Sequence, residues 1–356
     1  MSADGQETSN EPTSGEPRRS IFAFYHDPPI WIETSPVSLE QNPPTVNFDA
    51  FNTEVARRTI AGGVQVRVSV EGFFVFDFQA WPPGHRLEWV DGTRPPSFEA
   101  MADAAVNRTY VMNAFNVFFY SRLIEAAHAT TDRMVVTPEL LISSESLDTE
   151  DGQSFGNTRV SHLAMSRYVS TYNPVRPYGF DDRIHHRFPV VPKAVVESAI
   201  DDLSDLMGRG EKEDIYLLDL FLRASKAYQD HNHSLSVITY WAVIERLVNV
   251  LWQQMQADNK TRDGQAFIEG ARKKRLEDGR TFSASVMTEI LSLMSYLPLD
   301  VYNDLAAVRK VRNNWMHSLA PVTAQDAEKA NSVCEKLLKQ VKGYVVNGAS
   351  GRRIHG

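Results

Sequence analysis

The spacing of apolar residues changes once along the chain, after Gly208-Arg-Gly210, and this change constrains the fold more than any other feature of the sequence. Before that point, Gly63–Glu71 alternates apolar and polar residues strictly, which is typical of a half-buried strand. After it, apolar residues recur every three or four positions over long stretches, which is typical of helices packed on a core. The sequence therefore predicts an α+β N-terminal domain followed by an all-α C-terminal helical bundle.

Four consecutive parts are expected. Residues 1–20 are rich in Ser, Glu, Pro and Gly, a composition typical of a disordered tail. Residues 21–208 are expected to form the α+β domain, with a sensory or regulatory role, and residues 213–345 the helical domain. Residues 346–356 are expected to be a flexible tail. The one cysteine, Cys334, cannot form an internal disulfide, so nothing indicates an oxidising compartment.

Individual elements follow from the same periodicities and from capping residues. The alternation predicts strand structure over 63–78, with a bulge or turn at Gly72. The other elements expected in the N-terminal region are a strand at 86–90, a helix at 98–128, a strand at 133–143 and a helix from Pro192 to Met207. Helices are expected further along at 213–229, 234–255, 264–277, 283–297 and from Leu299, with a last helix that Thr323 caps and Gly343 or Gly348 ends.

The helix that begins at Leu299 holds the candidate site. Its apolar stripe is Val301, Leu305, Val308 and Trp315, and Arg312 lies on that stripe, where a guanidinium needs a partner or an interface. At about 100° per residue, Arg312 and His317 lie about 140° apart on a regular helix. They converge on one substrate only if the helix ends or bends near Met316, which Pro321 favours, or if a second subunit completes the site.

A carboxylate on another helix is the expected partner of Arg312. Glu245 lies on the face of Trp241, Val248 and Trp252, where an unpaired charge is costly. We therefore expect Glu245 within hydrogen-bond reach of Arg312. The alternative is that Glu245 lies exposed at the edge of the apolar face.

Together these segments resemble a known family. The combination YWAVIERLVN, a charged interval and LAAVRKVRNNWMHS resembles the HEPN domain (higher eukaryotes and prokaryotes nucleotide-binding), and within it the Apea-like branch of phage-defence proteins. The resemblance covers about 213–345 and implies a helical bundle that forms homodimers. In that family an Arg, four to six residues and a His cut RNA without a metal, which assigns catalysis to Arg312 and His317, with Asn313 beside the arginine. Asn314 is a supporting candidate. One branch carries a tyrosine two residues after the histidine, where this chain has Leu319.

The residue types fit RNA cleavage. RNA is cut when its own 2′-OH attacks the adjacent phosphate, which requires a proton acceptor, a proton donor and stabilisation of the phosphate charge. A histidine moves protons near neutral pH, and an arginine fork fits the non-bridging oxygens. Asn313 could orient either group. No cofactor or metal is expected.

The formal net charge of −8 excludes global attraction of polyanions, so any nucleic-acid site must be local. The strongest basic run is Arg272-Lys273-Lys274-Arg275, a candidate for contacts with an RNA backbone or, equally, a solvated helix face. Arg309 is a further candidate for such contacts. The pair His231 and His233 is expected to be a loop or helix cap, and His185-His186-Arg187 a solvated loop.

Two function classes remain open. The first is a metal-independent endoribonuclease, a toxin or phage-defence effector whose N-terminal domain meets a trigger ligand or protein. The second is a non-catalytic HEPN scaffold or nucleotide-binding module that acts through a partner. An acidic, polar N-terminus and the lack of an apolar run of membrane-spanning length lead us to expect a cytoplasmic protein with no membrane partner.

Overall fold

The computed structural model describes residues 21–27, 30–35, 37–38, 45–46, 53–78, 98–126, 132–143, 189–262 and 264–348. The expected disordered tail at 1–20, the strand at 86–90 and the run His185-His186-Arg187 lie outside these residues.

A five-stranded antiparallel sheet forms the N-terminal end of the fold, in the order β5-β6-β7-β1-β8. The strands are β1 (Ile21–Tyr25), β5 (Glu54–Thr59), β6 (Gln65–Ser69), β7 (Phe73–Asp77) and β8 (Ile142–Ser143). Two further strand pairs are short: β2 (Trp31–Ile32) with β9 (Val190–Val191), and β3 (Val37–Ser38) with β4 (Thr45–Val46).

The strand structure predicted over 63–78 is confirmed as β6 and β7, joined by a tight turn at Gly72. Gly72 has a φ of +68°, and a Cβ there would lie 2.8 Å from Cγ1 of Ile30. Only glycine fits this turn without strain. The strand is buried more fully than predicted, since the polar members Arg67 and Ser69 of the alternation are also buried.

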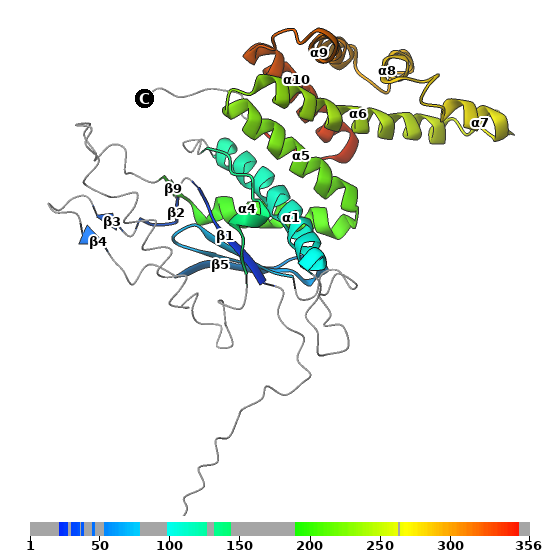
Figure 1. Ribbon diagram of the computed structural model, residues 1–356. Coiled ribbons are helices and arrows are strands. Elements are labelled where there is room, and N and C mark those ends of the chain that lie inside the picture. Colours follow the sequence, from blue (N-terminus) through cyan, green and yellow to red (C-terminus); the bar gives the residue numbers. More distant parts are fainter. Residues whose placement is uncertain are drawn as a thin grey trace, which may run out of the picture.

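Helices cover one face of the sheet. α1 (Phe98–Glu125) and α4 (Lys193–Arg209) confirm the two helices expected in this region. The ring of Phe74 lies 5.3 Å from that of Phe115 and 5.8 Å from that of Phe119, so aromatic side chains join β7 to α1. Figure 1 shows α1 and α4 between the sheet and the remaining helices.

The strand predicted over 133–143 is mostly wrong. Only Ile142 and Ser143 pair with a strand, and a 3-10 turn precedes them. Side chains of α1 replace the missing strand partner: the Asn113 amide donates to the carbonyl oxygen of Val136 (3.1 Å) and accepts from its N–H (2.7 Å). The segment is extended because a helix, rather than a sheet, satisfies its backbone groups.

The rest of the chain is helical, as expected. The long helices are α5 (Lys212–Gln229), α6 (His233–Asp258), α8 (Ala284–Leu293), α9 (Leu299–Ser318) and α10 (Ala324–Leu337), which continues as a π-helical turn, η5 (Leu338–Lys342). The expected cap of α10 is confirmed: Thr323 and Asp326 accept hydrogen bonds from each other's backbone N–H. Gly343, with a φ of +75°, ends the last turn.

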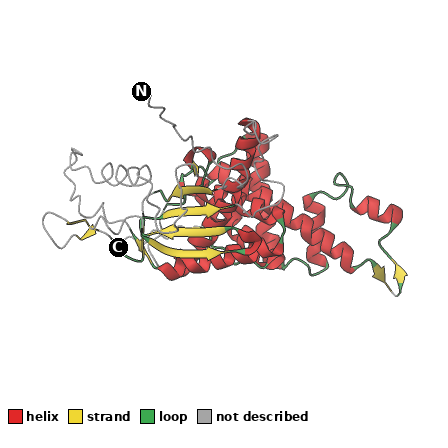
Figure 2. Ribbon diagram, turned by 90° about the horizontal axis from the view of Figure 1, so that it is seen from below, coloured by secondary structure: helices red, strands yellow, loops and turns green. Residues whose placement is uncertain are grey.

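Between α6 and α8 the chain forms a projection that we call the arm, residues 259–282. It holds a hairpin of β10 (Thr261–Arg262) and β11 (Gln265–Ala266) and the short helix α7 (Gly270–Leu276), where a helix over 264–277 was predicted. The arm lies at the tip of the molecule farthest from the five-stranded sheet (Figures 1 and 2). Trp252 anchors its base, because its indole N–H donates to the carbonyl oxygen of Leu276 (3.0 Å).

One large apolar core runs from the sheet through the bundle, and a second, smaller cluster includes Tyr25, Trp31 and Phe73. Buried residues from Phe24 to Val346 form one cluster that includes all the long helices. The chain returns to α1 after η5: the N–H of Asn347 donates to Oγ of Ser121 (2.9 Å), and Arg133 donates to the Asn347 carbonyl (2.8 Å). Residues 346–348 are therefore packed, although they were expected to begin the flexible tail, and residues 349–356 lie outside the described ones.

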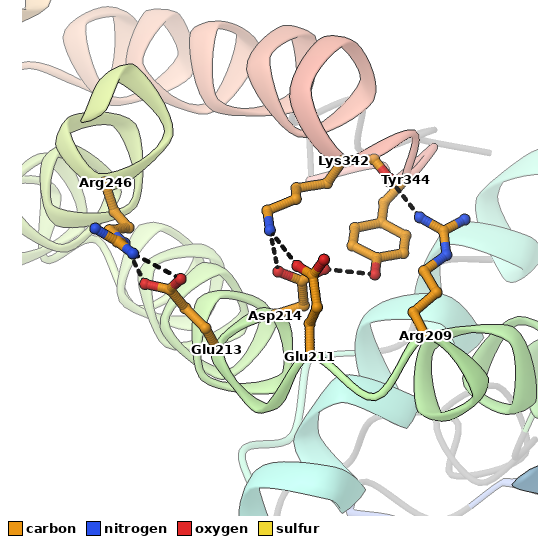
Figure 3. A network of polar contacts seen from close by, with 7 residues as sticks. All are labelled: Arg209, Glu211, Glu213, Asp214, Arg246, Lys342 and Tyr344. Carbon is orange, nitrogen blue, oxygen red and sulfur yellow. Dashed lines mark hydrogen bonds and ion pairs between the residues drawn. The ribbon is translucent and has the colours of Figure 1, made fainter. Parts of the chain in front are cut away.

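A polar network fixes this return (Figure 3). The ammonium of Lys342 lies 2.7 Å from the buried carboxylate of Asp214, which also accepts from the Tyr344 hydroxyl (2.7 Å). Nearby, the hydrogen bonds from Arg246 hold the pKa of Glu213 below its usual range. The network joins the start of α5 to the end of the chain.

By length and composition alone, α6 could cross a membrane, and among the described helices it is the one candidate. Half of its most apolar window is buried inside the fold, as in the core helix of a bundle.

Candidate functional site

The candidate site lies on the second half of α9. The first half packs on the bundle through Val301, Leu305 and Val308, which are buried. The helix stays regular through His317 and ends at Leu319, whose φ is +52° and whose N–H donates to the carbonyl oxygen of Trp315. The helix therefore ends two residues after Met316, as Pro321 favours, but it is regular through His317, so its end does not change the angle between Arg312 and His317.

No residue from 310 to 318 is buried. Trp315 is half-buried, the Met316 side chain is 48% exposed and Leu319, just beyond the helix, is 74% exposed. The apolar stripe thus continues past the part of α9 that the bundle covers.

Arg312 is half-buried, and one Nη atom donates to Oδ1 of the adjacent Asn313 (3.0 Å). Within the described chain Arg312 has no ion pair. The Asn313 amide oxygen thus contacts one side of the guanidinium. Asn313 was expected to orient either Arg312 or His317, and its side chain contacts Arg312.

The expected pairing of Glu245 with Arg312 is wrong. Glu245 is exposed, and its side chain forms no hydrogen bond or ion pair with the described residues. Its backbone carbonyl accepts from the Asn249 amide (2.8 Å). The physical reason is the width of the buried face of α6: Trp241, Val248 and most intervening apolar positions are buried, and Glu245 lies at the edge of that arc. The alternative of an exposed carboxylate therefore describes Glu245.

His317 is exposed in the last turn of α9. Since the helix is regular, Arg312 and His317 remain about 140° apart around its axis. Asn313 lies between them, because it touches Arg312 and precedes His317 by one turn. One chain alone does not bring the arginine and the histidine together on one substrate.

The other two candidates on α9, Arg309 and Asn314, differ in whether the side chain contacts the rest of the protein. Arg309 is half-buried, and its guanidinium points to α8, where it lies 3.4 Å from Oγ1 of Thr288. Asn314 is exposed, and its carbonyl accepts from the Ser318 hydroxyl (2.6 Å). Of these two, only Asn314 presents its side chain to solvent beside His317.

The basic run Arg272, Lys273, Lys274 and Arg275 is exposed on α7. No hydrogen bond or ion pair within the described residues joins α7 to α9, so this run and the α9 site are separate features. Sequence reasoning missed Arg262 and Phe267, which the hairpin brings beside Arg272. The available signal was an aromatic residue between two arginines.

His231 and His233 flank the N-cap of α6. Asn232, between His231 and His233, caps α6 by accepting from the N–H of Leu235 (3.2 Å). The described residues hold no group of three or more His, Cys, Asp or Glu side chains placed to bind a metal ion.

No protein-family model, no curated protein and no solved structure matches this chain.

Proposed function

We propose that the chain is a metal-independent endoribonuclease of the HEPN type, whose site is completed in a homodimer. The observation that supports it is the uncovered second half of α9. This segment combines exposed apolar residues with Arg312, Asn313 and His317. A second copy on this surface would bury Met316 and Leu319 and bring the arginine of one subunit near the histidine of the other.

Two-fold symmetry removes the geometric difficulty. In an isologous interface each subunit contributes the same patch, so residues on diverging faces of one helix meet residues of the partner helix. The 140° between Arg312 and His317 then separates two half-sites that the symmetry axis brings together.

The chemistry needs only side chains at such a site. His317 takes the proton of the ribose 2′-OH as O2′ bonds to phosphorus and the bond from phosphorus to O5′ breaks. The leaving O5′ takes up a proton, which gives a 2′,3′-cyclic phosphate and a 5′-hydroxyl. Arg312, oriented by Asn313, donates to the non-bridging oxygens as their charge rises. DNA lacks the 2′-OH and is not cut.

Cleavage of a labelled RNA by the purified full chain in EDTA tests this proposal. We expect His317→Ala to lose about 10²–10⁴-fold in rate, the usual contribution of a proton-transfer group. Asn303→Ala, an exposed position of the same helix, should leave the rate unchanged. A strand with 2′-deoxyribose at every position should survive. Equal cleavage by the parent and His317→Ala contradicts the catalytic assignment.

Subunit mixing tests the shared site. Arg312→Ala and His317→Ala are each inactive, but a dimer of one subunit of each kind holds one intact Arg312–His317 pair. Random mixing should restore about a quarter of the parental activity, since half of the dimers are mixed and each has one of two sites. If mixing restores no cleavage activity, Arg312 and His317 act within one subunit and the shared site is wrong.

The interface itself can be removed. Met316→Glu together with Leu319→Glu should give monomers in light scattering at tens of micromolar, roughly the range of weak interfaces. Leu299→Glu, an exposed leucine at the other end of α9, should leave the dimer intact. Three results together would favour the second function class, a non-catalytic scaffold. The parent would be monomeric, it would not cut RNA, and cells that express the chain would not lose RNA.

A further inference from the structure

The arm differs in charge from the rest of the protein. Residues 259–282 hold seven Lys and Arg against four Asp and Glu, a net charge of +3. Because the whole chain has a formal net charge of −8, the other 332 residues together carry −11. On an acidic protein, a polyanion can bind only where positive charge is concentrated locally. The arm provides such a concentration.

Most of the arm's cations form no ion pair with the described residues. Arg272, Lys274 and Arg275 are exposed and form no ion pair among the described residues. Lys273 lies 3.7 Å from Glu277, and exposed pairs of this length contribute little. These cations are therefore free to meet an external anion.

An aromatic ring organises two of the guanidinium groups. The guanidinium carbon of Arg272 lies 3.8 Å from the centroid of the Phe267 ring, and that of Arg262 lies 5.6 Å from it. Stacking on a ring fixes the plane of a guanidinium and leaves its N–H edge open. The hairpin and α7 thus present two preorganised arginine forks next to the lysines.

The shape of the arm favours a flexible chain over a folded protein as its ligand. The four consecutive cations Arg272–Arg275 spread over about 300° around α7, so they share no flat face. Within the described residues, none of the exposed large hydrophobic side chains lies on the arm. Protein interfaces depend on buried aromatic and aliphatic anchors, which the arm lacks. A polymer that wraps around a helix can reach all four cations.

We propose that the arm binds the sugar-phosphate backbone of single-stranded RNA, as a site separate from the reacting groups of α9. The choice of RNA among polyanions rests on the proposed function, whereas the binding of a phosphodiester backbone rests on the arm itself. Held at the end of α6 by Trp252, the arm would capture the strand at a distance from the scissile bond. It would give affinity without sequence preference.

Binding can be measured without cleavage. Fluorescence anisotropy of a labelled 20-nucleotide uridine RNA, with the full chain carrying His317→Ala, gives the affinity whether or not the α9 site is catalytic. Lys273→Glu with Lys274→Glu should weaken binding by about tenfold or more, and the loss of two phosphate contacts should reduce the salt slope by about 1.4. The matched control, Lys329→Glu with Lys339→Glu, reverses two exposed lysines on α10 and η5 and should leave the affinity unchanged.

A second pair of variants tests the stacked geometry at constant charge. Arg272→Lys removes the contact with Phe267, whereas Arg275→Lys makes the same substitution on the same helix where no ring contact exists. We expect the first to weaken binding several-fold more than the second. Equal effects would overturn the role of the ring.

Each remaining outcome decides the proposal. No measurable RNA binding, or equal affinity of the arm and control variants, overturns it. Displacement of the RNA by poly-glutamate as readily as by unlabelled RNA would make the arm a site for acidic peptides and would also overturn it. If a deoxyuridine strand binds with the same affinity as the RNA, the arm is a site for a phosphodiester backbone, and the proposal that it prefers RNA is wrong. Because the readout is binding, intact binding with no cleavage by the parent would refute only the proposed nuclease.

Discussion

Lys342 forms the most buried ion pair among the described residues. Its side chain is 11% exposed and lies 2.7 Å from the carboxylate of Asp214, whose side chain is 1% exposed. Lys342→Met would leave that carboxylate with the Tyr344 hydroxyl alone. We expect a loss of about 3 kcal/mol in the free energy of unfolding, as for other buried pairs that lose one partner. Chemical denaturation measures it, and the exposed Lys339→Met should change stability by less than about 0.5 kcal/mol.

The pH dependence of this difference has a definite sign. Burial lowers the pKa of Lys342, but hydrogen bonds to Asp214 and Glu211 outweigh it and raise the pKa above its usual value. A raised folded-state pKa stabilises the fold below the unfolded value, about 10.4 for lysine, and this stabilisation is lost as the pH rises through the folded value. The gap between the parent and Lys342→Met should therefore stay constant from about pH 6 to 9. A gap that shrinks within this range would contradict the role of the ammonium.

Single residues also show the limit of sequence reasoning about the site. The sequence could single out Arg312, because a charged residue on an apolar stripe is visible in the spacing. It could not assign the partner, because the width of the buried arc of α6 depends on how many helices pack around it. Glu245 lies just outside that arc, and only tertiary packing decides on which side of the edge it falls.

At the scale of elements, the start of α10 depends on one side chain. Oγ1 of Thr323 accepts from the N–H of Asp326 (3.2 Å), and the Asp326 carboxylate accepts in return. Thr323→Ala should cost about 1 kcal/mol, as for other N-cap residues. Thr239→Ala, the same change inside α6, should be neutral or slightly stabilising, because alanine favours helix interiors. The midpoint of thermal unfolding should fall for Thr323→Ala and should stay the same or rise slightly for Thr239→Ala; an equal fall in both variants would refute the capping role.

Elements were predictable where local spacing decides them and unpredictable where a distant partner does. The long helices and the caps of α10 follow from periodicity and capping residues, which act within a few positions. The segment 133–143 was predicted as a strand from its composition. Instead, the side-chain amides of Asn113 and Asn116 on α1 donate to its backbone carbonyl groups. No residue near the segment in the sequence indicates these hydrogen bonds. The hairpin of the arm was missed because its strands have two residues each.

At the scale of the whole molecule, the change of periodicity after Gly210 marks a change of structure but not a break in the core. The rings of Phe118 on α1 and Tyr344 near the chain end lie 6.1 Å apart. Arg133 donates to the carbonyl oxygen of Asn347, 214 residues further along. Contacts between residues so far apart in the sequence do not affect the spacing of apolar residues. The sequence could therefore suggest a domain boundary after Gly210, but it could not show that the two regions share one core.

The shared core predicts a single cooperative unfolding transition. Since α1 packs on the sheet through Phe115 and on the bundle through α5, neither region can lose its structure without exposing apolar surface of the other. Truncation after Lys342 removes Tyr344 and Val346, both buried, and should destabilise the whole molecule by about 3 kcal/mol or more at roughly 1.5–3 kcal/mol per buried apolar side chain. Truncation after Gly348 keeps these contacts and serves as the matched control. Calorimetry should give one peak for the parent and for both variants, at lower temperature only for the shorter one. Two separate peaks, or a shorter variant that loses only its helical signal, would mean that the sheet and the bundle unfold independently.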